Sequence, residues 1–269
     1  MTLEFLYGTK LGRILLKPLV RPGLSKFCGK LLDTNASKIL IKPFIKNNGI
    51  DMSEYQDEKY TCFNDCFCRK IRPECRPIDM NGNNLISPCD GLLSAYKITD
   101  GLVIPVKGSS YSMMSLLRNS ALASEYEGGT CLVFRLCVNH YHRYIYPDNG
   151  TKGDNIFIPG VLHTVRPVAL AARQVFVENS REYTVINSEN FGPLVQMEVG
   201  AMLVGKISNN MGAGVVKRGE EKGKFLYGGS TIIMLVKKDA ASVKQEYFDA
   251  TSRSEELPVK MGQVIGGKE

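Results

Sequence analysis

The feature of this sequence that most limits its fold is a succession of short apolar runs that begins after Cys62. The runs are rich in β-branched and aromatic residues and are separated by glycine, proline and asparagine, so they predict strands joined by turns. They cover residues 92–98, 102–106, 131–138, 155–158, 183–186, 194–199, 202–207 and 231–236. We therefore predict an α+β fold with a strand-rich main domain.

Three other segments complete the predicted organisation. Residues 112–122 form the best candidate for an internal helix. Residues 51–59 are polar and acidic and are typical of a linker, and the polar tail after Asp239 is expected to be peripheral. We therefore divide the chain at residue 50 and treat residues 51–269 as one domain.

Positive charge is concentrated in the first 50 residues. The whole chain has a formal charge of +7, from 34 Lys and Arg against 27 Asp and Glu. Residues 1–50 alone carry +7, because their only acidic residues are Glu4 and Asp33, so residues 51–269 balance to zero. The basic residues of the segment are Lys10, Arg13, Lys17, Arg21, Lys26, Lys30, Lys38, Lys42 and Lys46. This distribution indicates that the segment meets an anionic surface.

Proline divides this basic segment into short predicted helices, because Pro18, Pro22 and Pro43 each kink or end a helix. In the first helices, basic and apolar side chains fall on opposite sides at helical spacing. The basic set is Lys10, Arg13, Lys17 and Arg21, and the apolar set is Leu11, Leu15, Leu16 and Leu19. Such an amphipathic segment suits a helix that lies in a membrane surface.

Two interpretations of residues 1–50 stay open. Basic residues beside an anionic leaflet contribute about 1 kcal/mol each, which in sum is enough for reversible docking of a membrane-associating segment. Alternatively, the segment is a solvated basic face that covers the core. Nucleic-acid binding fits less well, because aliphatic rather than aromatic side chains alternate with the basic residues.

The sequence also predicts where the protein acts. No apolar run approaches the roughly 18 to 20 residues that cross a bilayer, so no spanning helix is expected. The N-terminus, with Glu4 and Gly8, lacks the layout of a signal peptide. Together with the basic segment, these features predict a peripheral protein at the cytoplasmic face of the cell membrane.

Eight cysteines without a signal peptide favour free thiols in a reducing cytosolic setting over a disulfide framework. Four of them cluster at Cys62, Cys66, Cys68 and Cys75. Their spacing is not a paired C-x-x-C array, and no histidine lies near enough in sequence to complete a zinc knuckle. We therefore predict buried thiols and no metal site.

The chain has three histidines, His140, His142 and His163, and histidine is the usual general base near neutral pH. His140 and His142 are two residues apart, so on a strand they would face the same side. Taken alone, each histidine is more often structural than catalytic.

Two glycine-containing segments could carry chemistry. In residues 87–91 (Ser-Pro-Cys-Asp-Gly), Asp90 either caps a turn that leads into a strand or orients a histidine, as a triad carboxylate does. At Gly228, Gly229 and Ser230, two glycines precede a serine at the entrance to a strand. Most such sequences are simple turns, but the flexible glycines would also let the serine hydroxyl reach the preceding carbonyl.

Taken in order, these segments resemble the phosphatidylserine decarboxylase family over roughly residues 60–269. Residues 63–70 followed by 76–78 are similar to the family's F-N-x-F-F-x-R-K and R-P-I, and residues 87–91 to its S-P-x-D-G. Residues 141–143 match Y-H-R, residues 199–205 resemble V-G-A-x-x-V-G, and residues 217–223 with 229–231 match K-R-G-E-E-x-G and G-S-T. Any one match is weak, but the ordered set is specific.

The resemblance implies a self-processing lyase. Ser230, deprotonated by His142 with Asp90 behind it, would attack the carbonyl of Gly229 and convert the peptide bond to an ester. Elimination would split the catalytic domain, leaving residues 1–229 as the β chain and 230–269 as the α chain, which stay associated. Residue 230 would become a covalent pyruvoyl cofactor. The phospholipid substrate's amine would form a Schiff base with that cofactor, lose carbon dioxide, and leave as phosphatidylethanolamine.

The chain departs from the family pattern at two positions. Many members have a second histidine where this chain has Ile145, so His142 is expected to act as the base alone, with His140 or His163 as substitutes. His140 itself stands where an acidic or polar residue is common.

Substrate-binding residues are harder to assign from the sequence. Arg69, Arg76, Lys107 and His140 are candidates for binding the substrate headgroup, although salt bridges within the fold would explain the cations equally well.

Three alternatives remain at this point. A relative that decarboxylates a free amino acid would share the chemistry, and a serine hydrolase could use Asp90, His142 and Ser230. Against the hydrolase, the chain has no G-x-S-x-G elbow around this serine. A non-catalytic binding module is supported only by the strand pattern. The sequence leaves open whether the chain forms a homo-oligomer.

Overall fold

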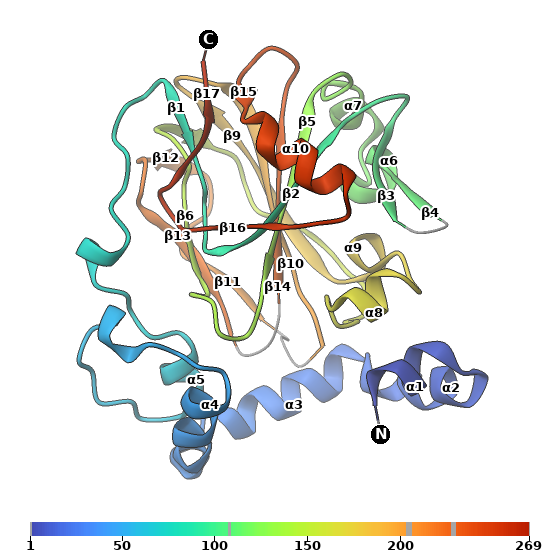
Figure 1. Ribbon diagram of the computed structural model, residues 1–269, viewed down its shortest axis with the longest axis vertical. Coiled ribbons are helices and arrows are strands. Elements are labelled where there is room, and N and C mark those ends of the chain that lie inside the picture. Colours follow the sequence, from blue (N-terminus) through green and yellow to red (C-terminus); the bar gives the residue numbers. More distant parts are fainter. Residues whose placement is uncertain (1, 107–108, 203–205, 227–229, 269) are drawn as a thin grey trace.

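A nine-stranded antiparallel sheet forms the centre of this computed structural model, which describes residues 2–106, 109–202, 206–226 and 230–268, without the side chains of residues 102–110 (Figure 1). Across the sheet the strands are β12 (Gly214–Val216), β7 (Gly150–Lys152), β9 (Arg181–Ser188), β10 (Gly192–Val199), β14 (Ser230–Val236), β5 (Thr130–Leu136), β2 (Gly91–Lys97) and β16 (Leu257–Val259), with β8 (Ile156–Ile158) paired to β9. The predicted α+β class is confirmed.

Smaller sheets accompany the central one. One contains β11 (Ile207–Asn209), β13 (Glu221–Phe225) and β6 (Arg143–Ile145), and another contains β1 (Asn84–Ile86), β17 (Val264–Gly267) and β15 (Ser242–Val243). A separate hairpin joins β3 (Leu102–Val106) and β4 (Ser109–Ser112). Of the strand predicted at 202–207, residues 203–205 lie outside the described residues, and Ile207 begins β11.

Both faces of the central sheet are buried, which explains why β14 is apolar almost throughout. Successive side chains of a strand point to opposite faces. Ile232 and Met234 belong to a core cluster that includes Tyr144 and Phe225 of the small β11–β13–β6 sheet. Ile233 and its alternating neighbours belong to a second cluster on the opposite face. The central sheet is therefore the middle layer of the domain.

Short helices cover parts of both faces. They are α6 (Met113–Leu117), α7 (Ser120–Ser124), α8 (Pro167–Leu170), α9 (Val175–Glu178) and α10 (Gln245–Ser252). The single helix predicted at 112–122 is wrong, because Arg118 adopts a left-handed conformation with φ of 50° and ends α6. Asn119 then caps α7 by accepting a hydrogen bond from the Leu122 amide.

The prediction that the tail after Asp239 is peripheral is also wrong. Strand β16 pairs with β2 of the central sheet, and β17 pairs with β1. Tyr247 and Ile265 are buried in the same core cluster as Met234. The apolar residues of the tail are too widely spaced to form a run, so the sequence showed no burial signal.

Residues 51–59 are less of a linker than their composition suggested. Met52–Glu54 form the short helix η2, and Tyr55 is 5% exposed and forms a bridge with Ile71. Two more short helices follow, α5 (Phe63–Phe67) and η3 (Pro73–Cys75). This part of the chain packs onto the main domain rather than spanning a gap.

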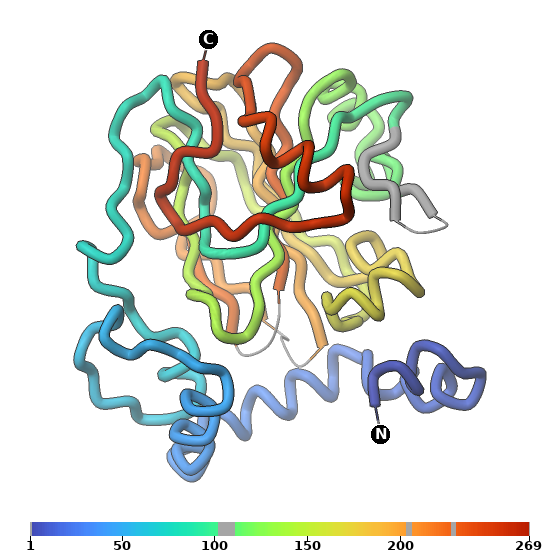
Figure 2. Tube along the Cα trace, viewed as in Figure 1, coloured from blue at the N-terminus to red at the C-terminus, as the bar shows by residue number. Residues whose placement is uncertain are grey.

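The N-terminal segment is helical, as predicted, and lies along one end of the sheet (Figures 1 and 2). Its helices are α1 (Leu3–Gly8), α2 (Lys10–Leu19), α3 (Pro22–Leu32), η1 (Asn35–Leu40) and α4 (Ile41–Asn47). Pro18 stands one residue before the end of α2, and Pro22 begins α3. Pro43 is tolerated in the first turn of α4, where its missing N–H has no helical partner to lose.

Specific contacts attach this segment to the main domain. The Tyr7 hydroxyl lies 3.1 Å from Nδ1 of His163, and the Leu162 amide donates to the Val20 carbonyl over 2.9 Å. The apolar set predicted on α2 is divided between core and surface: Leu16 is buried, whereas Leu11 is 59% exposed. The segment therefore both covers the core and presents apolar side chains outward.

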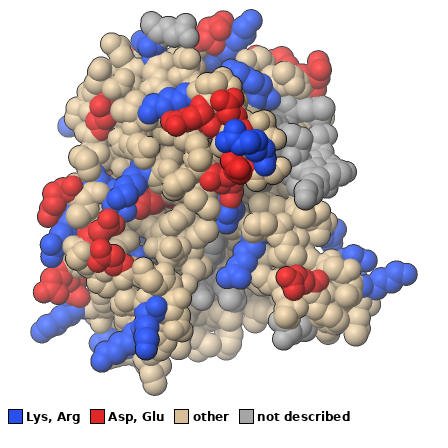
Figure 3. All heavy atoms as spheres, in the orientation of Figure 1, with Lys and Arg blue, Asp and Glu red and all other residues tan. Residues whose placement is uncertain are grey.

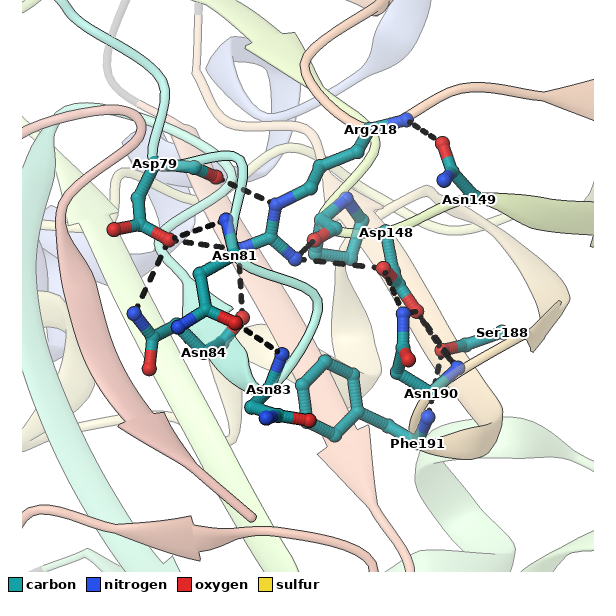
Figure 4. A network of polar contacts seen from close by, with 11 residues as sticks. Asp79, Asn81, Asn83, Asn84, Asp148, Asn149, Ser188, Asn190, Phe191 and Arg218 are labelled. Atoms are coloured by element: carbon teal, nitrogen blue, oxygen red, sulfur yellow. Dashed lines mark hydrogen bonds and ion pairs between the residues drawn. The ribbon is translucent and has the colours of Figure 1, made fainter.

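Arg218, from the K-R-G-E-E segment, holds several loops together (Figure 4). Its guanidinium is almost fully buried and donates to the carbonyl oxygens of Asp79, Asn84 and Pro147. It also pairs with Asp148, whose carboxylate accepts hydrogen bonds from the loop that follows β9. The motif residue thus has a structural role in this fold.

A buried ion pair joins the central sheet to the β11–β13–β6 sheet. Nζ of Lys222 on β13 lies 2.7 Å from Oε2 of Glu198 on β10, and both side chains are fully buried. Asn209 of β11 accepts from the same ammonium over 3.0 Å and donates to Glu198. Burial raises the pKa of Glu198, while Lys222 acts to lower it.

Lys222→Met is expected to destabilise the fold by about 3 to 5 kcal/mol, because it leaves the Glu198 carboxylate buried without its cation. Urea unfolding in a Ser230→Ala background, in which the chain would stay intact, measures the change. Lys224→Met on the same strand is the matched control, since Lys224 is half-buried and forms no ion pair among the described residues. Equal, small losses for both variants would contradict the structural role of the pair.

Candidate active site

Ser230 is the first residue of β14, in the middle of the central sheet. Its Cα partner on β5 is Leu136, and the neighbouring Thr231 pairs with Val199 of β10. The Ser230 side chain is fully buried, and its Oγ has no hydrogen-bond partner among the described residues. A buried hydroxyl without a partner is costly, so this position is unusual for a purely structural serine.

Asp90 lies at the same end of the sheet as Ser230. Strand β2 begins at Gly91 and runs along the other side of β5, with Leu92 opposite Arg135. The residues just before Leu92 therefore lie beside Leu136, which is also the partner of Ser230. Asp90 and Ser230 thus flank the same end of β5 from its two sides.

The Asp90 carboxylate is held by two groups. Arg76 donates to it through Nε and Nη2, at 2.8 and 2.7 Å, and the Met261 amide donates over 2.9 Å. Arg76 also pairs with Glu54 at 3.0 Å. The guanidinium of Arg76 is therefore already engaged by two carboxylates, and Asp90 is fixed in place by a bidentate pair.

His142 joins this end of the sheet through the loop that follows β5. Its carbonyl accepts from the Phe225 amide over 2.9 Å, which attaches it to β13. Phe225 belongs to the core cluster of Ile232, and Ile232 faces the same side as Ser230 because strand side chains alternate. The layer that carries His142 thus covers the face of the sheet on which the Ser230 side chain lies.

The tautomer of His142 is set by the backbone. Nδ1 lies 2.9 Å from the carbonyl oxygen of His140, and a carbonyl can only accept, so Nδ1 carries the proton of the neutral ring. Nε2 then has the lone pair that a general base needs. From the sequence we expected Asp90 to orient the His142 ring, but in the structure the His140 carbonyl fixes which ring nitrogen carries the proton. A contact between Asp90 and His142 stays a prediction.

His140 lies in the same loop and is half-buried. Its Nδ1 accepts a hydrogen bond from the Cys137 amide over 3.2 Å. Burial lowers the pKa of His140, and the nearby Asp90 carboxylate opposes that shift. His163 differs, because Tyr7 and Glu178 contact its two ring nitrogens, each at 3.1 Å.

Arg69 is a buried cation near the same loop. It is 1% exposed, and its Nη2 donates to the Tyr55 hydroxyl at 3.0 Å and to the Asn139 carbonyl at 3.3 Å. The guanidinium carbon lies 4.1 Å from the centroid of the Tyr55 ring. Among the described residues no carboxylate pairs with Arg69, and its buried Nε has no hydrogen-bond partner.

The predicted site residues thus divide into groups. Asp90, His142, His140 and Arg76 are brought to one end of the sheet with Ser230. Gly229 and Lys107 lie outside the described residues. No group of three or more His, Cys, Asp or Glu within the described ranges could hold a metal ion. Of the four clustered cysteines, Cys62, Cys66 and Cys68 are buried free thiols as predicted, whereas the free thiol of Cys75 is only half-buried.

Sequence reasoning missed three neighbours of the site. The Phe67 ring lies 4.2 Å from the His142 ring, centroid to centroid, Tyr55 stacks on Arg69, and Glu54 pairs with Arg76. Phe67 falls in a motif that carried the resemblance, but its spacing indicated no role. Tyr55 and Glu54 fall in residues 51–59, which we interpreted as a linker because the segment is polar and acidic, so no contact with the site was expected.

Known proteins that resemble this chain point to one family. Residues 63–267 match the family model described as phosphatidylserine decarboxylase. The chain is 43% identical over 265 residues to "Phosphatidylserine decarboxylase proenzyme 2" of Clostridium acetobutylicum, covering 98% of this chain and 91% of the relative. It is 40% identical over 268 residues to "Phosphatidylserine decarboxylase proenzyme" of Clostridium perfringens, covering 97% and 91% of the two chains. This chain belongs to the phosphatidylserine decarboxylase family.

Proposed function

We propose that this chain is a phosphatidylserine decarboxylase, a carboxy-lyase that converts phosphatidylserine to phosphatidylethanolamine and carbon dioxide. Family membership and the names of the relatives support the activity, and the word "proenzyme" in those names supports a self-processed chain. The observation that carries the proposal is the fully buried Ser230 hydroxyl, which has no hydrogen-bond partner in the described part of the chain and directly follows Gly229 in sequence.

In the proposed maturation, Nε2 of His142 takes the hydroxyl proton of Ser230, and Oγ attacks the carbonyl carbon of Gly229. The peptide bond becomes an ester. Loss of the α-proton of residue 230 then breaks its Cβ–Oγ bond, leaving a carboxylate on Gly229 and dehydroalanine at position 230. Water releases ammonia from that residue and leaves a pyruvoyl group.

The surroundings of Ser230 suit such a group. Ile232 and Met234, which share its face of the strand, are fully buried among apolar side chains, so bulk water is excluded beside the reactive residue. A pyruvoyl group supplies a ketone that binds the substrate amine and accepts the electron pair released with carbon dioxide. His142, with its lone pair at Nε2, would hold a proton for return to the substrate carbon.

Strand pairing would keep the two cleaved chains together. Residues 231–236 pair with β10 on one side, and residues 230–236 pair with β5 on the other. Further along the chain, β16 pairs with β2, and β17 pairs with β1. The proposed α chain, residues 230–269, would therefore remain an integral part of the sheet after cleavage.

Arg69 is our first candidate for the anionic part of the substrate headgroup. It is buried without a carboxylate partner among the described residues, and its Nη2 contacts the Asn139 carbonyl in the loop that carries His142. Planar guanidinium groups bind carboxylate and phosphate well. Arg76 is committed to Asp90 and Glu54, so we propose that it positions Asp90. His140 and Lys107 stay secondary candidates.

The N-terminal segment is proposed to dock on the membrane. Within the described residues, none of the helices has the length and apolarity to span a bilayer. Large apolar side chains nevertheless project from residues 1–50, namely Leu11, Ile14, Leu15, Phe27, Leu31, Ile39 and Leu40. Figure 3 shows Lys and Arg side chains on the lower part of the molecule, where Figure 1 draws these helices. An apolar surface with basic residues around it favours an anionic membrane.

This docking surface adjoins the proposed site. Phe44 of α4 contacts the rings of Phe63 and Phe67, at 5.0 and 6.0 Å between centroids, and Phe67 contacts the His142 ring. A phospholipid that entered between the helices and the sheet would thus reach the catalytic end of β14. This proximity favours a lipid over a free amino acid as substrate, and family membership favours a lyase over a serine hydrolase.

Ser230→Ala is expected to abolish both chain cleavage and decarboxylation, leaving a single 29.8 kDa band on a denaturing gel. His142→Ala should leave most of the chain uncleaved, because the base is lost. Thr231→Val is the matched control, because the Thr231 hydroxyl is likewise buried without a hydrogen-bond partner among the described residues but lies on the opposite face of the strand from His142, so this variant should mature normally. Release of carbon dioxide by an intact Ser230→Ala chain would refute the mechanism.

Arg69→Gln should raise KM for phosphatidylserine by about tenfold or more, with a smaller effect on kcat, because a charged contact to the headgroup is lost. The kcat value is calculated per molecule of mature, cleaved enzyme, so that a loss of folding or maturation is not counted as a loss of substrate binding. Lys59→Gln is the control, because Lys59 is an exposed cation ten residues away in sequence and forms no ion pair within the described ranges. An unchanged KM in mature Arg69→Gln would remove Arg69 from the substrate site.

The triple variant Leu11→Ser, Ile14→Ser and Phe27→Ser should weaken binding to phosphatidylglycerol-containing vesicles at least about tenfold, because each side chain would bury apolar surface in the membrane. Vesicle sedimentation measures this. The matched control replaces Ile156, Phe157 and Val215, which are exposed apolar residues on strands of the main domain, by serine. Equal loss in both triple variants would argue against a specific docking surface.

A further inference from the structure

A hollow of about 850 Å³ lies at the opposite end of the central strands from Ser230. Strand β14 runs from Ser230 to Val236, and the next two residues, Lys237 and Lys238, line the hollow. Thr130, the first residue of β5, also lines it, whereas the last residue of β5 pairs with Ser230. In Figure 1 this end of the sheet lies uppermost, and the N-terminal helices lie along the lower end. The hollow is therefore separate from the proposed active site.

The lining of the hollow is strongly basic, although the domain of residues 51–269 has no net formal charge. Residues 51–269 contain equal numbers of basic and acidic residues, yet the lining of the hollow has four lysines, Lys97, Lys237, Lys238 and Lys268, against the single acid Asp239. A concave surface lined by charges of one sign focuses the electric field and concentrates ions of the opposite sign.

Three of these lysines have no carboxylate partner in the part of the chain that the structure describes. Lys237 pairs with Glu125 at 2.6 Å, which neutralises it. Lys97 lies over the Phe248 ring, with Nζ 4.9 Å from the ring centroid, and neither Lys238 nor Lys268 forms an ion pair within the described ranges. A net positive charge is thus left for a ligand to neutralise.

The backbone beside the hollow makes room for one of the lysines. Gly128 has φ of +74°, and a Cβ built there would lie 3.2 Å from Cδ of Lys238. A side chain at this position would be strained and would crowd the lysine stem. Gly129, whose Cβ would lie 2.3 Å from the Val236 carbonyl oxygen, allows the chain to turn closely against the end of β14.

We propose that this hollow binds a water-soluble anion that carries more than one phosphate group. Lysine ammonium groups bind phosphate as point charges, and a volume of this size accommodates a small organic molecule as well as inorganic pyrophosphate. The choice of a soluble ligand over a lipid rests on the proposed membrane docking. An enzyme that docks through its N-terminal helices would hold the hollow at the far end of the sheet, toward the water.

The test is isothermal titration of the mature full-length enzyme with inorganic pyrophosphate. Binding is expected, and it should weaken as sodium chloride rises from about 50 to 200 mM, because the contacts are ionic. Lys238→Gln with Lys268→Gln should weaken binding about tenfold or more. Lys59→Gln with Lys217→Gln removes the same charge from two exposed lysines outside the hollow and should change pyrophosphate binding less than twofold.

Three results would overturn the proposal. The first is that the wild-type enzyme shows no detectable binding of pyrophosphate, and the second is that both double variants weaken binding equally. The third is that the Lys238 and Lys268 double variant no longer binds vesicles, which would mean that this end of the sheet faces lipid. Because these lysines are exposed and distant from Ser230, both double variants should mature normally. Failure of this proposal would leave the proposed decarboxylase activity untouched.

Discussion

The pairing of β14 on both sides is the interaction on which the rest of this structure depends. Strand β14 pairs with β5 over its whole length and with β10 from Thr231 onward, and its apolar side chains belong to core clusters on both faces of the sheet. This places Ser230 in the buried centre of the sheet. After the proposed cleavage before Ser230, the strand pairing would hold the new terminus in place.

The end of the sheet that holds the candidate site is assembled from distant parts of the chain. Strand β14 brings Ser230 and strand β2 brings Asp90 to the Leu136 end of β5, and the loop that follows β5 carries His142. Arg76 and the Met261 amide hold Asp90, and the His140 carbonyl holds the ring of His142. Asp90 and His142, two of the three residues proposed to react, are therefore oriented by neighbours that sequence spacing could not identify.

The two ends of the sheet differ in their surroundings. Near Ser230 lie helices with exposed apolar side chains and basic residues, and aromatic contacts through Phe44 and Phe67 lead from those helices to His142. At the other end lies an open hollow lined by lysines, without comparable apolar cover. One end thus suits a lipid surface and the other a soluble anion, and both rest on the same pair of central strands.

The sequence by itself determined the class of fold, the longer strands of the central sheet and the helical, basic N-terminus, because apolar periodicity, proline and charge are local properties. It did not indicate the three-residue strands β7, β12 and β16, which are too short to form an apolar run. Its ordered motifs also indicated the family and the residues Asp90, His142 and Ser230. Only the tertiary structure decided that the tail after Asp239 completes the core, that residues 51–59 supply Glu54 and Tyr55 to the site, and that Arg76 is bound by carboxylates. Those outcomes depend on contacts between residues far apart in the chain. A local sequence pattern does not indicate which distant residue a side chain will contact in the folded protein.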